Sequence, residues 1–199
     1  MNEIISVKQL SKSYGGLTAV QGLDLSVTQG TVFGLLGANG AGKSTTIECM
    51  LGTRKFDAGT VSILGMNPLL QRKQLFENVG VQLQEANYQD KVTVAELCEV
   101  TQSFYRNAAD YGELLKQFGI FDKAKSMVKE LSGGQRQKLF IVLALIPQPK
   151  VVFLDELTTG LDAKARREVW KILSDLKEKG MTIFLTSHFM DEVEALCDW

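Results

Sequence analysis

A glycine-rich stretch in the first quarter of the chain constrains the fold more than any other feature. Gly37-Ala38-Asn39-Gly40-Ala41-Gly42-Lys43-Ser44 matches the pattern G-x-x-x-x-G-K-S/T. It lies between an apolar strand pattern at 32–36 and a helical pattern at 43–51. Glycines there let successive backbone N–H groups converge on a phosphate, and the helix adds its positive end. A flexible turn would not explain the Lys-Ser pair, so we predict a phosphate-binding loop.

A second motif supplies what such a loop needs for catalysis. Val151–Leu154 reads as a buried strand and ends in Asp155-Glu156. In a phosphate-transfer site we expect Ser44 and Asp155 to hold Mg²⁺, Lys43 to reach the β- and γ-phosphates, and Glu156 to polarise the attacking water. Taken without the phosphate loop, Asp155-Glu156 could equally be two solvent-exposed acids at the end of a strand. Together with the phosphate loop, they predict a nucleoside triphosphatase.

Composition limits the remaining possibilities. The chain has 199 residues, 45% of them apolar, with 22 basic and 23 acidic residues. That length suits one domain, and the even charge balance argues against a nucleic-acid partner. No apolar run approaches the roughly 20 residues of a membrane span, and no secretory signal is visible, so we expect a soluble cytosolic domain. Three scattered Cys and one His make a zinc site or disulfide framework improbable.

The order of periodic segments predicts an α/β fold with an inserted helical lobe. Strand patterns occupy 4–10, 19–27, 32–36, 61–64 and 79–81. From 85 to about 145 the pattern is mostly helical, with a Thr93-x-x-Glu96 capping box and helices predicted over 93–105 and 111–118. Strands at 151–154 and 181–186 then flank a helix at 163–179, and a last helix starts near 189. We therefore expect a core of residues 1–84 and 146–199, and a lobe of residues 85–145.

Leu131-Ser132-Gly133-Gly134-Gln135 discriminates among triphosphatases; we call Ser132–Gln135 the SGGQ segment. Ser132 and Gln135 are spaced as a capping box for the following helix. Two glycines in a first helical turn cost about 1 kcal/mol each relative to Ala, so a simple cap would not select them. A backbone that must approach a ligand closely would select glycines at these positions. We interpret the segment as both a helix start and an anion-binding loop.

With these motifs in this order, the chain resembles the ATP-binding subunit of an ABC transporter, most similar to bacterial exporter-type subunits, over essentially its whole length. The resemblance implies a P-loop (RecA-like) core, an N-terminal antiparallel β subdomain and a helical lobe. It also implies that Tyr14 stacks on adenine, Gln84 joins the core to the lobe, Asp162 lies near the partner's site and His188 contacts the γ-phosphate. Alternatives remain: Tyr14 as a hairpin aromatic, Gln82 in place of Gln84, and Asp162 as a helix N-cap.

The resemblance further implies an ATP-dependent head-to-tail homodimer that drives a transmembrane permease from the cytoplasmic face of the inner membrane. Each ATP would lie between the phosphate loop of one copy and the SGGQ segment of the other. The implied residues are Glu156, His188, Gln84 and Lys43 for catalysis, Ser44, Gln84 and Asp155 for Mg²⁺, and Tyr14, Gly37, Asn39, Gly40, Gly42, Lys43, Ser44, Thr45, Ser132, Gly133, Gly134, Gln135 and Asp162 for ATP.

The sequence departs from the family pattern in two places. Leu157 replaces the usual Pro, which predicts a looser loop, and the chain stops at Trp199 where the family domain continues, so we expect it to be truncated. Transported substrates of the drug, lipid or ion class are all compatible with the resemblance. Two other functions stay open: a soluble ABC-type ATPase acting in translation or on DNA, and a nucleotide-binding module without turnover.

Overall fold

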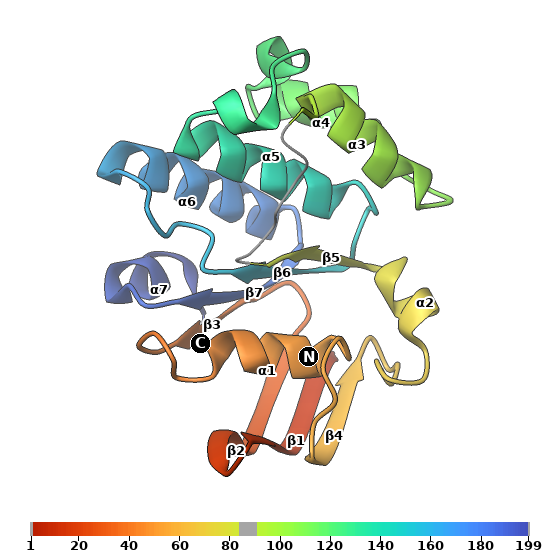
Figure 1. The fold of residues 1–199 in the computed structure, drawn as a ribbon, viewed down its shortest axis with the longest axis vertical. Helices are drawn as coiled ribbons and strands as arrows, with labels where there is room; N and C mark the ends of the chain where they lie inside the picture. Colours follow the sequence, from red (N-terminus) through yellow and green to blue (C-terminus); the bar gives the residue numbers. More distant parts are fainter. Residues whose placement is uncertain (1, 84–90, 199) are drawn as a thin grey trace.

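An antiparallel sheet forms the N-terminal part of the molecule (Figure 1). The structure is a computed structural model that describes residues 2–83 and 91–198. Strands β1 (Glu3–Tyr14), β2 (Leu17–Thr28) and β4 (Ala58–Ile63) pair in the order β2-β1-β4. Gly15 and Gly16, with φ of 52° and 90°, form the two-residue hairpin turn between β1 and β2. Tyr14 therefore lies at the very end of β1.

The second sheet is parallel and determines where the chemistry lies. Strands β3 (Val32–Leu36), β7 (Thr182–Ser187), β6 (Val151–Asp155) and β5 (Val79–Gln82) follow one another in that order. Because they all run the same way, their carboxyl ends meet at one edge, where open α/β sheets bind ligands. The phosphate loop, Asp155 and Ser187 all lie at that edge.

Helices cover both faces of the parallel sheet (Figure 1): α5 (Gly133–Leu145) and α6 (Ala163–Glu178) on one, α1 (Lys43–Met50) on the other. Successive residues of β6 alternate between two cores. Val152 and Leu154 join the core under α5 and α6. Val151 and Phe153 join the core shared with α1 and the antiparallel sheet. This double burial explains the uninterrupted apolar run of β6.

The remaining described elements are short. They are α2 (Arg72–Phe76), α3 (Val94–Ser103), α4 (Tyr111–Gln117), α7 (Met190–Leu196) and the 3₁₀ turns Phe121–Lys123 and Val128–Glu130. The capping box of Thr93 and Glu96 is formed at the start of α3, as predicted. Helices α3 and α4 pack on α5, whose other side contacts β5. The division into a core and a separate lobe stays a prediction, because α5 packs into one continuous core with both parts.

The architecture confirms the predicted α/β class, with an antiparallel sheet beside a parallel sheet that has helices on both faces. Among residues 2–83 and 91–198, we find no helix with the length and apolar character needed to cross a bilayer. Leu157, at the position where the resemblance predicts Pro, is buried in the core under α5 and α6.

Candidate functional site

The phosphate loop leaves the carboxyl end of β3 and leads directly into α1. Gly40 and Gly42 have φ of 82° and 84°, which side chains disfavour. A Cβ on Gly42 would also lie 2.2 Å from the carbonyl oxygen of Ala19, so this position requires glycine for both conformation and space. The first backbone N–H groups of α1 have no partners within the helix and are available to an anion.

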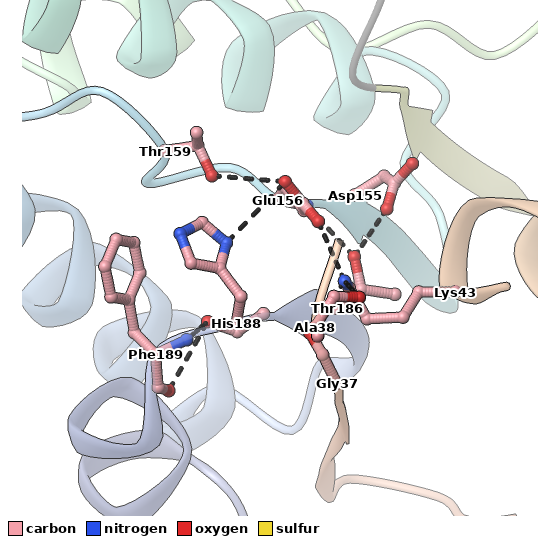
Figure 2. A network of polar contacts seen from close by, with 10 residues as sticks. Gly37, Ala38, Lys43, Asp155, Glu156, Thr159, Thr186, His188 and Phe189 are labelled. Atoms are coloured by element: carbon pink, nitrogen blue, oxygen red, sulfur yellow. Dashed lines mark hydrogen bonds and ion pairs between the residues drawn. The ribbon is translucent and has the colours of Figure 1, made fainter. Parts of the chain in front are cut away.

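Lys43 joins the loop to the end of β6 (Figure 2). Its Nζ donates hydrogen bonds to the carbonyl oxygens of Gly37 (2.8 Å) and Ala38 (3.0 Å). The same Nζ lies 3.0 Å from Glu156 Oε1, and both side chains are only 5% exposed. The two predicted motifs therefore meet in a buried ion pair.

Thr186 in β7 holds the Asp155-Glu156 pair. Its Oγ1 donates to Asp155 Oδ1 and accepts the backbone N–H of Glu156 at 3.1 Å. The backbone of Glu156 adopts φ 49°, a left-handed conformation that is uncommon for a non-glycine residue. Sequence reasoning missed Thr186, although it precedes Ser187-His188 at a strand end and so shares the edge with Asp155.

His188 faces the same carboxylate. Its Nδ1 lies 3.7 Å from Glu156 Oε2, while Thr159 Oγ1 donates to that oxygen at 3.4 Å. Within the described part of the chain, His188 Nδ1 is buried and has no hydrogen-bond partner. Figure 2 shows the imidazole directed at Glu156, with the ring of Phe189 beside it. Glu156 is thus contacted by Lys43, Thr159 and His188.

One hollow of about 420 Å³ contains most of the predicted nucleotide-binding residues: Tyr14, Asn39, Gly40, Gly42, Lys43, Ser44 and Thr45. It is also lined by the predicted base Glu156 and by Ala19, which the sequence did not single out. Gly37 adjoins it through its hydrogen bond with Lys43. Gln84 lies outside the described residues. Its rival Gln82 is buried at the end of β5, and its Nε2 donates to the carbonyl oxygen of Leu83.

Tyr14 is anchored at the rim of this hollow by its neighbours. Asp57 accepts hydrogen bonds from Lys12 Nζ at 2.8 Å and from the backbone N–H of Ser13 at 2.7 Å. These bonds, that to Lys12 foremost, lower the pKa of the Asp57 carboxyl. The Lys12 ammonium and the Arg54 guanidinium lie 5.2 and 5.5 Å from the centre of the Tyr14 ring. Both cations are paired with carboxylates, Lys12 with Asp57 and Arg54 with Glu48, so the feature left for a ligand is the exposed Tyr14 ring, on which a planar base could stack.

The SGGQ segment lines a separate hollow of about 390 Å³ between the first turns of α5 and α6. The capping box is formed: Gln135 N–H donates to Ser132 Oγ, and Ser132 N–H donates to Gln135 Oε1. A Cβ on Gly133 would lie 3.2 Å from Leu161 Cδ2, and one on Gly134 would lie 3.2 Å from Ala165 Cβ. Close packing against Leu161 and against the first turn of α6 is therefore a reason for these glycines that the sequence did not reveal.

Asp162 is the N-cap of α6. Its Oδ1 accepts the backbone N–H groups of Lys164 and Ala165, each at 2.9 Å. The structure thus bears out the N-cap alternative and leaves a second role open. Asp162 lines the SGGQ hollow, which shares no described residue with the phosphate-loop hollow. The predicted site residues therefore fall into two groups on one chain.

Comparison with known proteins identifies the family of the chain. Residues 20–159 match the family described as "ABC transporter". The chain is 40% identical over 199 residues to "Nod factor export ATP-binding protein I" of Burkholderia orbicola, covering 98% of this chain and 66% of the relative. It is 41% identical over 200 residues to the protein of the same name in Ralstonia nicotianae, covering 98% of this chain and 62% of that one. The chain thus spans just under two thirds of these relatives.

Solved structures show the same likeness. A structure titled "Structure of ATP binding subunit of ABC transporter" superposes with a TM-score of 0.85 at 27% identity, covering 98% of this chain and 83% of the other. The structure of cbiO1 from Clostridium perfringens, "Part of the ABC transporter complex cbiONQ", gives a TM-score of 0.85 at 28% identity, covering 100% and 83%. The chain therefore belongs to the ABC transporter family and has the fold of its ATP-binding subunits.

Proposed function

We propose that this chain binds and hydrolyses ATP to power an ABC transporter of the exporter type. The observation that carries the proposal is the 3.0 Å contact between Lys43 Nζ and Glu156 Oε1. It places the cation of the phosphate loop against the carboxylate of the second motif, at the edge of a parallel sheet. A triphosphate in the loop would thus have its terminal group between a cation and a base.

The hollow beside the loop fits a nucleotide. The glycine backbone and the first turn of α1 offer N–H donors to the phosphates, and Tyr14 at the rim offers an aromatic face to the base. In this proposal Lys43 exchanges the carbonyl oxygens of Gly37 and Ala38 for phosphate oxygens. Asn39, Gly40 and Thr45 complete the phosphate cradle.

Ser44 and Asp155 fit a Mg²⁺ site. Each is the chain neighbour of one member of the Lys43–Glu156 pair, and each offers the hard oxygen that Mg²⁺ prefers. No cluster of three or more His, Cys, Asp or Glu side chains that could form a metal cage exists among the described residues. Mg²⁺ is usually held by one or two protein ligands together with substrate phosphates and water, so Ser44 and Asp155 would suffice. When bound, the ion would neutralise charge developing on the β- and γ-phosphates. Gln84 would be a further ligand.

Glu156 is the proposed general base. Its carboxylate would accept a proton from a water that attacks the γ-phosphorus, while the bond to the bridging oxygen breaks and ADP leaves. His188 would donate a hydrogen bond to a γ-phosphate oxygen from the position where it now faces Glu156. Lys43 would stabilise the charge on the transferred group.

A second copy of the chain would complete the site. The SGGQ hollow shares no described residue with the phosphate-loop hollow, which supports a nucleotide bound between two copies rather than within one. Head-to-tail pairing would place Ser132–Gln135 and Asp162 of one copy over the ATP of the other. ATP would then hold the dimer together, because it binds the paired form preferentially.

The names of the relatives support a direction of transport. The first relatives are named for Nod factor export, which supports an exporter. We propose a membrane-embedded permease as the partner, which would hold the chain at the cytoplasmic face of the membrane. Substrate choice would belong to that permease.

The test compares ATP binding and turnover in the wild-type chain, Glu156→Gln and Glu178→Gln. Glu178, exposed at the end of α6, is the matched control. We expect E156Q to bind ATP and to lose about a hundredfold or more in kcat, while E178Q behaves as wild type. Hydrolysis by E156Q at the wild-type rate would overturn the base assignment. Failure of the wild-type chain to bind ATP would overturn the whole proposal.

A further inference from the structure

The segment that follows His188 is held in place by side chains of α6. Arg166 lies with its guanidinium carbon 4.1 Å from the centre of the Phe189 ring. Its Nη1 is 3.5 Å from Asp191 Oδ2, and its side chain is mostly covered. The buried Nε of Arg166 makes no hydrogen bond with any described residue. Ring and carboxylate therefore fix the position of the guanidinium.

Phe189 in turn limits His188. The two rings lie 3.9 Å apart between centroids, with planes at 39° (Figure 2). The backbone of Phe189 is fixed because its N–H donates to Ser187 Oγ at 2.9 Å. With Glu156 on its other side, the imidazole is held between a carboxylate and an aromatic ring.

We propose that Arg166 is a positioning residue for His188, acting through Phe189. The inference rests on the proposed role of His188 at the γ-phosphate. The guanidinium holds the phenyl ring by a cation–π contact, and the ring closes off other rotamers of the imidazole. Without the cation, Phe189 and His188 gain rotamers in which the imidazole no longer faces Glu156 and the phosphate position.

The position of Arg166 also connects the two hollows of the chain. Ala165, the preceding residue, borders the SGGQ hollow. Its Cβ is the atom that a Cβ added at Gly134 would approach most closely. A shift of the first turn of α6 at that hollow would move Arg166 with it. His188 is thus attached, through Phe189, to the helix that borders the proposed partner-binding surface.

A simpler role must be separated from this one. In that simpler role, Arg166 does no more than hold α6 against α7. Trp170 makes such a contact by donating a hydrogen bond from Nε1 to Glu192 Oε1 at 3.0 Å. That bond ties the same two helices together but involves neither Phe189 nor His188. Trp170→Phe is therefore a comparison for loss of helix docking alone. Arg167→Met is the matched control, because Arg167 is exposed on the same helix.

The sequence makes a direct readout possible, because His188 is the only histidine. Its imidazole NMR signals are recorded in the wild-type chain, R166M, R166K, R167M and W170F without nucleotide. In R166M we expect the signals to move toward those of a solvent-exposed histidine, as the ring-current shift from Phe189 is lost. In R166K, which keeps a cation near the ring, they should return most of the way. In R167M and W170F they should stay at the wild-type position.

Kinetics provide the second arm. We expect R166M to lower kcat about tenfold with little change in KM for ATP, because His188 is misplaced while the phosphate loop is intact. R166K should recover most of this loss. Wild-type His188 signals in R166M, or equal signal changes in R166M and W170F, would overturn the proposal. If R166M fails to fold, Phe189→Leu, which removes the ring but keeps apolar volume, decides: unchanged His188 signals in F189L overturn it.

The two arms distinguish this inference from the proposed function. If the wild-type chain shows no ATP turnover, the proposed function fails. The NMR arm then still shows whether Arg166 sets the position of His188. If turnover is normal and R166M matches R167M in both arms, only the inference fails.

Discussion

Lys43 and Glu156 form an ion pair with Nζ and Oε1 3.0 Å apart, and each side chain is 5% exposed. Lys43 also uses hydrogen bonds to Gly37 and Ala38, so its ammonium is fully engaged before any phosphate is bound. A nucleotide must therefore compete with Glu156 for the same ammonium. The pair couples the stability of the nucleotide-free chain to the nucleotide site.

This coupling predicts that Glu156→Gln lowers stability without nucleotide and enlarges the stabilisation that ATP provides. A neutral partner leaves the buried ammonium poorly compensated, so we expect E156Q without nucleotide to unfold about 1–3 kcal/mol more easily. Bound ATP–Mg²⁺ supplies the missing negative charge and should raise the melting temperature of E156Q more than that of wild type. Thermal unfolding with and without ATP measures both. An equal ATP shift in the two chains would show that the pair does not oppose binding.

The backbone of Glu156 gives a second prediction. At φ 49°, a residue with a Cβ is in a left-handed conformation that costs about 1–2 kcal/mol. Both E156G and E156A remove the carboxylate, but only Gly relieves this conformation. We expect E156G to be about 1 kcal/mol more stable than E156A, despite the greater chain entropy that Gly adds to the unfolded state. Chemical denaturation measures the free energy of unfolding of both variants. If E156A is the more stable of the two, the left-handed geometry at position 156 is contradicted.

The two glycines of the SGGQ segment should differ in tolerance. An added Cβ at Gly133 meets the mobile end of Leu161, whereas one at Gly134 meets the Cβ of Ala165, which has no rotamer to change. Alanine gains about 1 kcal/mol over glycine in a helix, so G133A should be neutral or stabilising. G134A should be destabilising.

Ala165→Gly supplies the control for this contact. In a double-mutant cycle, A165G should cancel most of the packing cost of G134A, since it removes the atom that is struck. Free energies of unfolding of the four chains measure the coupling. Additive effects would mean that Gly134 does not pack against Ala165 as the structure shows.

The fold follows from the sequence wherever pattern and local chemistry agree. The apolar run of β6, the phosphate loop and the Thr93 capping box were all predicted because period, turn residues and caps are local signals. The sequence does not predict helix α2 or the extension of β1 to Tyr14, because a five-residue helix and a strand with bulges have weak hydrophobic periodicity. Contacts between distant segments were also beyond reach. Three such contacts depend on packing between segments, which no single segment encodes: Thr186 with Asp155, Gly134 with Ala165, and Arg166 with Phe189.

Cys98 predicts how stability changes at high pH. Burial, with a smaller contribution from Glu99, raises the pKa of its thiol from 9.0 to about 12. Above pH 9 the unfolded chain ionises this thiol while the folded chain keeps it protonated, so rising pH favours unfolding through this group. At pH 10 the loss is about 1 kcal/mol. Cys98→Ala should reduce the fall in unfolding free energy between pH 8.5 and 10.5, and an unchanged slope would contradict the burial of the thiol.

Asp162 allows a helix cap to be separated from a contact between subunits. Asn keeps a side-chain oxygen that can accept the N–H groups of Lys164 and Ala165, whereas Ala cannot. We expect D162A to lose about 1 kcal/mol of stability and D162N to lose only a few tenths. In an E156Q background with ATP, light scattering then measures dimer formation. If the Asp162 carboxylate also contacts a second copy, D162N dimerises less than its parent although its helix is intact. If D162N dimerises as its parent does, capping α6 accounts for Asp162 completely.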